Sequence, residues 1–458
     1  MYAGFDYGTS NCAVGITRTQ VEGSGVELLP LEQGSSFMPS TLYSLERELI
    51  SEAVGLAMPD GLEKESYIQL RSGFLAQAQR IRRDEGIGDH ERTLYVGNEA
   101  INQYLSFPGQ GYFVKSPKSY LGASGLRPEF ISFFEDLVTA MMQQIKRRAE
   151  QSLGDSISHT VIGRPVNFQG LNAEQSNRQA IDILTVSARR AGFKSVEFLY
   201  EPLAAGLDFE ARLNQDKTVL VVDVGGGTTD CAMVRMGPGH RNNQDRTRDF
   251  LGHSGERVGG NDLDILLAGK QLMPLFGMQS KLKNGLPLPT QVFWDAVSTN
   301  DVGAQANFNS KKTTLHLEQL RLDSAEPNYI DRFIDLRNAK QNHHVVRSAE
   351  QCKVALSDSE QHAVDLSYIE AGLGCDITRQ QFSEAIDRPL NKMAALMDEA
   401  MQQAGCQPDL VYLTGGSGKS LDIRNMVANK VGNIPLIDGD HFGSVAAGLT
   451  VWARKLFQ

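Results

Sequence analysis

Apolar residues occur along the chain in two periodicities that together predict an α/β protein. Short, largely apolar runs at residues 2–5, 219–222 and 410–413 lie before glycine-containing turns and are typical of buried strands. Longer stretches place apolar residues three and four positions apart, which predicts amphipathic helices at 130–153, 173–191, 383–404 and 444–456. Strands and helices in alternation along one chain indicate an α/β fold.

Two segments give no clear pattern. Residues 20–112 mix polar and glycine-containing patches, so few elements are predicted there. Residues 274–345 are rich in Pro, Asn and Ser, and we interpret them as an insertion of uncertain structure.

One strand–turn–strand pattern occurs twice. The segments GFDYGTSNCAVGI, from residue 4, and VVDVGGGTTDCAMV, from residue 221, share an apolar strand, Asp, any residue, Gly, Thr and a second apolar strand. A repeated unit half a chain apart suggests two related halves that face one cleft. The alternative is coincidence, because Asp-x-Gly turns are common hairpin connections.

Two facing turns of this kind would make a phosphate site. Glycine-rich turns expose N–H groups that cradle phosphate oxygens. Asp6 and Asp223 would converge there, and two carboxylates about 4–5 Å apart repel by about 3 to 4 kcal/mol at an effective dielectric constant of about 20. Such a pair favours a cation, and Mg²⁺ that bridges phosphates through waters is the natural choice. The pattern therefore predicts a nucleotide di- or triphosphate with Mg²⁺.

A third glycine turn, LTGGSGKS, follows the apolar run before residue 414. Its end resembles a Walker A loop, but that motif requires glycine where this chain has Leu413. A turn that lets an adenine or ribose pack on Gly415 and Gly416 agrees better with the sequence. A purely structural turn between strand and helix is the other interpretation.

Composition and charge limit the kinds of molecule that the protein is expected to bind. The 458 residues carry a net charge of −10, which argues against nucleic acid or an anionic membrane as the main partner. Five cysteines without a CxxC pair predict reduced, packed thiols. The first residues lack a basic stretch, and no segment reaches the ~18 apolar residues of a membrane span. We therefore expect a cytoplasmic protein.

The motifs in their order resemble the DnaK-like, seventy-kilodalton heat-shock chaperone family, and most of all its short YegD-like members. Besides the three glycine turns, the resemblance rests on VKSPKSYLGAS (114–124), YEPLAAGLD (200–208) and RVGGNDLD (257–264). It implies a two-lobed actin-like ATPase fold, of the ribonuclease H-like type, with the nucleotide in the interlobe cleft. Lobe I would comprise 1–205 with 435–458, and lobe II 206–434, including the insertion at 274–345.

The resemblance assigns roles at the phosphate end. Asp6 and Asp223 would hold Mg²⁺ through its waters. Lys118 would reach the γ-phosphate and the attacking water, with Lys115 as the rival candidate, and Glu201 would orient that water with help from Asp230. Backbone and hydroxyl donors would come from Gly8, Thr9, Ser10, Asn11, Gly225, Gly226, Gly227 and Thr228, of which Thr228 also counts as catalytic. From the residues alone, Glu201 could also be an N-cap or surface carboxylate, and Lys118 a surface lysine.

The nucleoside end matches the family less closely. The segment RSAEQCKVALS (347–357) would hold adenosine, and Val354 stands there in place of the family's base-stacking arginine. Lys419 likewise replaces an arginine. An aliphatic side chain can cover a base but lacks the cation–π contribution of about 1 kcal/mol. The implied contacts are Glu350, Lys353, Ser357, Gly259, Gly260, Gly415, Gly416 and Ser417.

The implied function is that of a slow, Mg-dependent ATPase that acts as a conformational switch. The chain ends where the family continues into a peptide-binding domain, so we expect a separate client or co-chaperone protein. Pro165 and Arg178 match residues that relay nucleotide state in the family, although Pro165 could simply end a strand. The alternatives are a small-molecule kinase of the same superfamily and a non-catalytic, actin-like nucleotide-binding protein.

Overall fold

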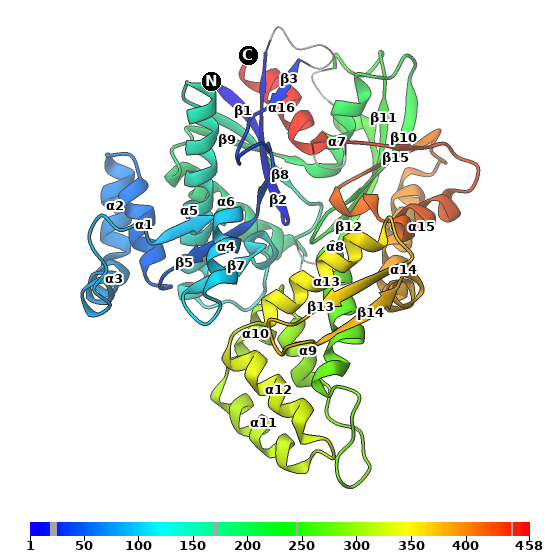
Figure 1. Ribbon diagram of the computed structural model, residues 1–458. Coiled ribbons are helices and arrows are strands. Elements are labelled where there is room, and N and C mark those ends of the chain that lie inside the picture. The colour runs from blue at the N-terminus through cyan, green and yellow to red at the C-terminus, as the bar shows by residue number, and fades with distance from the viewer. Residues whose placement is uncertain (19–24, 169–172, 244–245, 441–442) are drawn as a thin grey trace.

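Two β-sheets of equivalent strand order form the centre of the protein (Figure 1). The computed structural model describes residues 1–18, 25–168, 173–243, 246–440 and 443–458. The first sheet has the order β3-β2-β1-β8-β9, with β4 paired to β2: β1 Tyr2–Tyr7, β2 Asn11–Thr17, β3 Val26–Leu28, β4 Met38–Pro39, β8 His159–Arg164, β9 Ser195–Tyr200. The second has the order β12-β11-β10-β15-β16: β10 Lys217–Val224, β11 Thr229–Met236, β12 Phe250–Glu256, β15 Leu410–Thr414, β16 Leu436–Asp438.

The strand pairings confirm the repeat predicted from the sequence. In the first sheet β1 runs antiparallel to β2 and parallel to β8. In the second sheet β10 runs antiparallel to β11 and parallel to β15. Each half therefore begins with a hairpin whose first strand is central, and it then adds parallel strands on the other side of that strand.

Both central sheets are covered on both faces, which explains their continuous apolar runs. Because side chains alternate along a strand, Val161 packs on the layer that contains α7 (Glu201–Glu210) and α16 (Ser444–Phe457), whereas Ile162 packs toward α5 and α6. In the second sheet Val221 contacts the same α7–α16 layer, and Val222 faces α8 and α14. The two outer layers contain α5 Pro128–Leu153, α6 Ala173–Arg190, α8 Gly260–Leu267, α14 Arg379–Ala404 and α15 Leu421–Val431. Helices α7 and α16 thus join the two sheets.

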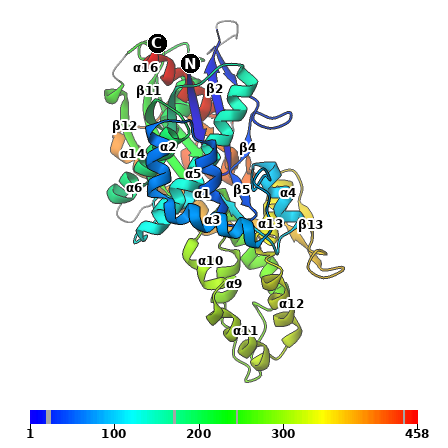
Figure 2. The same ribbon diagram turned by 90° about the vertical axis from the view of Figure 1, so that its left-hand side faces the viewer.

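The segment without a clear pattern near the N-terminus folds as a small sheet with four helices. Its strands have the order β6-β5-β7; α1, α2 and α3 lie near α5, and α4 packs on the small sheet (Figure 2). The bounds are β5 Thr41–Ser44, α1 Leu49–Ala57, α2 Leu62–Leu70, α3 Ser72–Asp84, β6 Leu94–Val96, α4 Asn98–Ser106 and β7 Tyr112–Lys115. Buried Arg71 fixes α3 to α5 through an ion pair with Asp136, in which Nε and Oδ2 lie 3.1 Å apart. Strands of three or four residues are too short for their periodicity to be recognised in the sequence.

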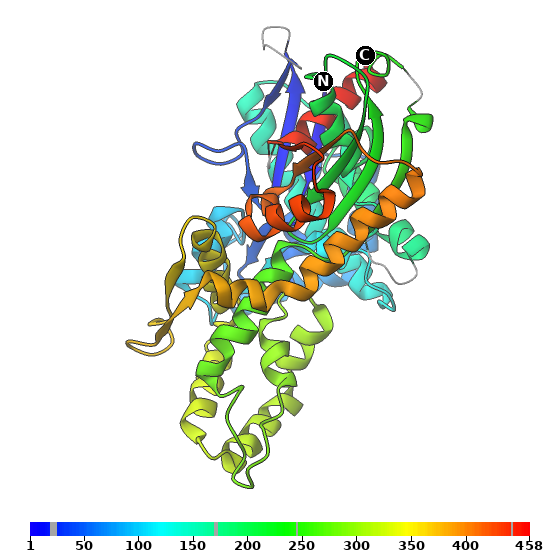
Figure 3. The same ribbon diagram turned by 90° about the vertical axis from the view of Figure 1, so that its right-hand side faces the viewer.

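The expected insertion is helical. Residues 268–276 extend α8 by a π turn and a 3₁₀ turn, and four helices follow that project away from the sheets (Figures 1 and 3). They are α9 Gln291–Val297, α10 Val302–Phe308, α11 Lys311–Asp323 and α12 Pro327–Asn338. Buried Phe276, Phe293 and Phe308 surround Phe333 at their centre. The segment therefore contains an aromatic cluster that continues the core of the second sheet, although its Pro and Asn content did not indicate one.

The remaining elements bring the chain back to the sheets. Helix α13 (Asn342–Leu356) leads to the hairpin β13 (Gln361–Asp365) and β14 (Gly374–Thr378). Helix α14 begins at Arg379 with Thr378 as its N-cap, and it continues through Pro389. Strand β16 hydrogen-bonds to β15 in the second sheet, and α16 then returns to β1 in the first. None of the helices in the described ranges is long and apolar enough to cross a membrane.

The crossing of α7 and α16 gives a prediction about stability. A Cβ atom on Gly448 would lie 1.6 Å from the carbonyl oxygen of Ala204, so Gly448→Ala must push the two helices apart. We expect a loss of about 1–3 kcal/mol in the free energy of unfolding. Gly73→Ala is the matched control, because Gly73 lies in α3 with open space around it and the alanine should be neutral or slightly stabilising there. Urea unfolding measures both variants, and equal midpoints would contradict the close crossing.

Candidate functional site

The two repeated glycine turns lie against each other between the sheets. A Cβ atom on Gly226 would lie 1.8 Å from Oγ of Ser10, and one on Gly227 would lie 2.7 Å from Cγ2 of Thr9. Each turn connects a central strand to its antiparallel neighbour, so the strands direct both turns to the same place. Glycine is required at these positions because the opposite turn occupies the space of a side chain.

A cleft of about 520 Å³ opens beside these turns. Its walls come from both halves of the chain, and they hold most of the residues that the sequence predicted. Those on the wall are Asp6, Gly8, Thr9, Ser10, Asn11, Glu201, Asp223, Gly225, Gly226, Thr228, Glu350, Lys353, Ser357, Gly415, Gly416 and Ser417. Residues hundreds of positions apart in the sequence thus line one hollow.

Four carboxyl groups and one ammonium group meet at the phosphate end predicted from the sequence. Lys118 lies buried on a 3₁₀ turn (Pro117–Tyr120), where its Nζ pairs with Oε1 of Glu201 and lies 3.4 Å from the carbonyl oxygen of Gly163. Glu201 is the first residue of α7, and Tyr200 is its N-cap, so Glu201 is neither a cap nor a surface carboxylate. Lys115 points elsewhere and pairs with Glu350, with Nζ and Oε2 at 2.7 Å. The fold therefore favours Lys118 over Lys115 at this end.

Burial makes the neighbouring aspartates hard to ionise. Burial and the nearby charge of Glu201 raise the pKa of Asp6 to about 7, although Lys118 opposes the shift. Burial and Glu201 likewise raise the pKa of Asp230 to about 7, even though Oδ1 accepts a hydrogen bond from the Val166 N–H at 2.6 Å. Burial, Glu201 and Asp230 raise the pKa of Asp223 well above its ordinary value. A cation between these groups would relieve the repulsion.

The donor set suits Mg²⁺ that keeps its waters. Hard carboxylate oxygens are the ligands this ion prefers, and it usually binds through one or two carboxylates. Within the described residues no three His, Cys, Asp or Glu side chains are placed to hold a metal directly. Asp6 and Asp223 therefore fit a hydrated ion rather than a bare one.

Gly259 and Gly260 lie behind the turn rather than on the cleft wall. The Gly260 N–H donates to the Gly225 carbonyl at 3.0 Å, and the Asn261 N–H donates to the Gly226 carbonyl at 2.7 Å. A Cβ atom on Gly259 would lie 2.8 Å from the Gly225 carbonyl oxygen. These glycines allow α8 to approach the turn closely and to fix its shape.

Helix α13 forms the opposite wall, where adenosine was expected. Lys353 pairs with buried Asp264, with Nζ and Oδ1 at 2.7 Å, and lies 3.3 Å from the Gly260 carbonyl oxygen. Burial raises the pKa of Asp264 to about 6, which Lys353 opposes. Val354 also lines the cleft, and its side chain is 61% exposed there. The residue that replaces the stacking arginine thus faces the cleft and is largely uncovered.

The third glycine turn reaches the second by a side-chain contact. Gly415 adopts a φ of +82°, and Oγ of Ser417 donates to the Gly225 carbonyl at 2.9 Å. Leu413 is a fully buried residue of β15, so the chain before the turn is sheet and not a Walker A loop. Lys419 lines the cleft as well.

A narrow chamber next to Lys118 contains a residue that the sequence did not suggest. Arg257 lines it with Thr9, Lys118, Gly227 and Thr228, and within the described chain its buried Nε has no hydrogen-bond partner. The only signal was its place directly before the Val-Gly-Gly of RVGGNDLD. Other wall residues that sequence reasoning missed are Phe37, Leu263, Asp358, Ser420 and Val445.

The two residues expected to relay nucleotide state lie in different environments. Pro165 follows β8 and lines the chamber beside Lys118. Arg178 is on the surface of α6, where it pairs with Glu174 at 3.1 Å. Only Pro165 is therefore next to the candidate site.

Comparisons with known proteins agree with this geometry. The Hsp70 protein family model matches residues 129–281 and 326–456. "Chaperone protein DnaK" of Elusimicrobium minutum (strain Pei191) is 23% identical over 466 residues, and "Chaperone protein HscA homolog" of Vibrio vulnificus (strain YJ016) is 23% identical over 454 residues. These alignments cover 99% and 98% of this chain, and they cover 57% of each relative.

The matched residues include the second hairpin, β10–β11, and helices α7, α8, α13 and α16 around the cleft, whereas the first hairpin lies outside the matched ranges. Hsp70 proteins share the two-lobed, actin-like ATPase fold, and two equivalent mixed sheets around a cleft agree with that fold. The chain belongs to the Hsp70 family.

Proposed function

We propose that this protein binds Mg·ATP in the cleft, hydrolyses it slowly with water as acceptor and acts as a chaperone-like conformational switch. The observation that carries the proposal is the buried group of Asp6, Glu201, Asp223 and Lys118 beside two glycine turns. Phosphoryl transfer depends mainly on positioning and charge neutralisation, and this set supplies both.

Each residue has a definite task in this proposal. Asp6 and Asp223 would hold Mg²⁺ through waters, and the ion would neutralise phosphate charge. The N–H groups of Gly226, Gly227 and Thr228 would hold phosphate oxygens, as exposed backbone N–H groups do in other anion sites. Lys118 would neutralise the γ-phosphate, and its ion pair keeps the Glu201 carboxylate oriented to accept a hydrogen bond from the attacking water.

The switch would consist of the two lobes moving about α7 and α16. We propose 1–205 with 435–458 as lobe I and 206–434 as lobe II. Contacts across the cleft would respond to the bound nucleotide: Asp230 to Val166, Lys115 to Glu350 and the Tyr104 hydroxyl to the Lys340 carbonyl, at 2.6, 2.7 and 2.7 Å. The chain spans 57% of the length of the curated relatives, so its client or co-chaperone, its ADP/ATP cycle and a cytoplasmic site of action are all part of the proposal.

A non-catalytic, actin-like binding role is the second candidate, because exposed Val354 offers no cation to the base. A kinase of the same superfamily would use the same phosphate site. Water is the favoured acceptor because Glu201 is held beside Lys118 at the phosphate end.

Phosphate release from Mg·ATP, with no acceptor added, tests the leading proposal. We expect the wild-type protein to turn over slowly. Turnover should fall about 100-fold in Glu201→Gln, because that variant loses the group that orients water. It should also fall in Asp223→Asn. Glu197→Gln is the matched control, since Glu197 is exposed on β9. Turnover that persists in Glu201→Gln would contradict the assigned role, and tight binding without any release would favour a kinase or a pure binding protein.

The raised pKa values predict how Mg²⁺ binding depends on pH. Asp6 and Asp230 have pKa values of about 7, above the ~3.9 of an unfolded aspartate, so the ligand-free fold loses stability as the pH rises through 7. Mg²⁺ needs the ionised carboxylates, so Mg·ADP should raise the melting temperature more at about pH 8 than at about pH 6. Thermal unfolding measures this difference, which Asp6→Asn should reduce. An equal stabilisation at both pH values would argue against metal at these carboxylates.

Val354 gives a prediction about base affinity. Val354→Arg would place a guanidinium on the wall where the base is expected, and a cation–π contact of about 1 kcal/mol should tighten ADP binding about fivefold. Val354→Leu keeps the aliphatic wall and should leave the affinity close to that of the wild type. Isothermal titration calorimetry measures all three proteins. Unchanged or weaker binding in Val354→Arg would show that the base lies elsewhere.

A further inference from the structure

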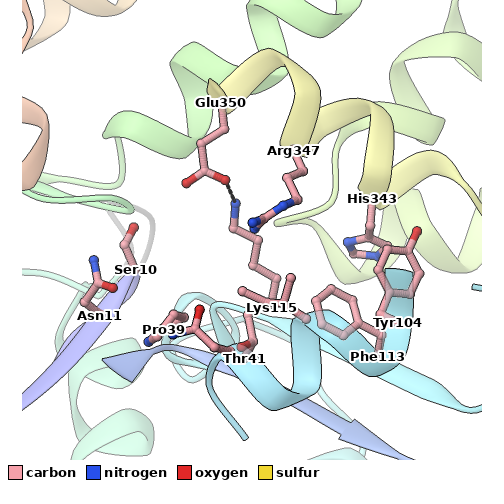
Figure 4. A pocket seen from close by; sticks show the side chains of 12 residues that line it. Ser10, Asn11, Pro39, Thr41, Tyr104, Phe113, Lys115, His343, Arg347 and Glu350 are labelled. Atoms are coloured by element: carbon pink, nitrogen blue, oxygen red, sulfur yellow. Dashed lines mark hydrogen bonds and ion pairs between the residues drawn. The ribbon is translucent and has the colours of Figure 1, made fainter. Parts of the chain in front are cut away.

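A second cavity, of about 240 Å³, lies where the two lobes meet (Figure 4). One side comes from the turn after β1, from α4 and from β7, and the other side comes from the first half of α13. Ser10, Asn11 and Glu350 belong to this cavity and to the nucleotide cleft, so the two hollows are neighbours. Figure 4 shows the Lys115–Glu350 ion pair between Ser10 and Asn11 on one side and the aromatic residues on the other.

Positive charge is in excess in this cavity. Lys115 and Arg347 both line it, and Glu350 is the one carboxylate on its wall. Glu350 is already engaged by Lys115 at 2.7 Å. The guanidinium of Arg347 helps to lower the pKa of Glu350, but it makes no hydrogen bond or ion pair with a side chain that the structure describes, and Figure 4 shows it beside Lys115. Two neighbouring cations with one anion leave the guanidinium available to a negatively charged group.

The far wall is aromatic. The rings of Tyr104 and Phe113 stack with centroids 4.5 Å apart and an interplanar angle of 15°. His343 meets both rings edge-on, at 5.9 and 5.5 Å, and its burial lowers its pKa to about 4, so it stays neutral. The buried Nδ1 of His343 has no hydrogen-bond partner in the described chain. Ile101 and Pro39 add further apolar surface.

We propose that this cavity binds a small organic anion, with its carboxylate or phosphate on Arg347 and Lys115 and its apolar or aromatic body against Phe113 and Tyr104. The volume is below the ~300–1,000 Å³ typical of pockets for larger ligands, which limits the occupant to a small molecule. Binding sites for small molecules usually combine a largely apolar wall with a small number of polar groups that point to one place.

The position of the site implies a link between the lobes. The ligand would touch β7 of the first half and α13 of the second, so it would bind best when these elements are close together. The cavity itself does not depend on a nucleotide, and its test needs none.

Methyl NMR spectra of the nucleotide-free protein, titrated with benzoate and with phenyl phosphate, test the proposal. The δ1 methyl of Ile101 reports on this cavity, and the methyls of Val354 report on the nucleotide cleft. We expect saturable shifts at Ile101, with little change at Val354. Benzyl alcohol and benzylamine, the neutral and cationic counterparts, should bind clearly more weakly. The two anions together distinguish a carboxylate from a phosphate head group.

Variants distinguish binding of the anion in this cavity from unspecific binding to the protein surface. Arg347→Gln should weaken benzoate binding about tenfold or more, as expected for a lost charge-assisted hydrogen bond, and Arg347→Lys should restore part of it. Arg388→Gln, an exposed arginine on α14, is the control and should bind like the wild type. The proposal is overturned by no saturable shift at Ile101 with either anion, by equal binding of benzyl alcohol, by wild-type affinity in Arg347→Gln, or by shifts at Val354 alone.

Discussion

The burial of four carboxyl groups around one ammonium group is the constraint on which the rest of this structure depends. Glu201 pairs with Lys118. Among the described residues, no other lysine or arginine forms an ion pair with the remaining carboxyl groups, which are those of Asp6, Asp223 and Asp230. Buried charges of one sign are unfavourable unless protons or cations compensate them. The two lobes therefore meet around a group that a bound cation would stabilise.

The same constraint explains the glycines. To bring Asp6 and Asp223 to one point, two hairpin turns must touch, and a side chain on Gly226 or Gly227 would occupy the space of Ser10 or Thr9. The two sheets have equivalent strand orders, so each places its hairpin turn at the same end of its central strand, and the two turns meet. Donors from α8 and from the third turn then hold the second hairpin from behind: the Gly260 N–H and the Ser417 hydroxyl donate to the Gly225 carbonyl, and the Asn261 N–H donates to the Gly226 carbonyl. The phosphate end is thus held from several sides, and the wall formed by α13 packs against α8.

Contacts at that junction use charged and aromatic side chains instead of glycine. Lys115 and Glu350 close the gap between β7 and α13, and Tyr104 reaches the carbonyl of Lys340. Such contacts are individually weaker than a packed core. Their side chains also leave a second hollow next to the cleft, and the guanidinium of Arg347 on its wall makes no hydrogen bond or ion pair with a side chain that the structure describes.

The sequence by itself determined the repeated hairpins, the α/β class and the family, and it predicted many of the residues that line the cleft, because these are short local patterns with a fixed chemical meaning. It did not indicate the small sheet around β5, the aromatic cluster of the α9–α12 segment or Arg257, since short strands and isolated residues carry no periodicity. Only the tertiary structure decided between Lys115 and Lys118. Ser116, between them, has a left-handed φ of 57°, and the turn that follows directs Lys118 to Glu201, 83 residues away, while Lys115 meets Glu350, 235 residues away. Such partners come together only when distant segments pack, and no local pattern encodes that.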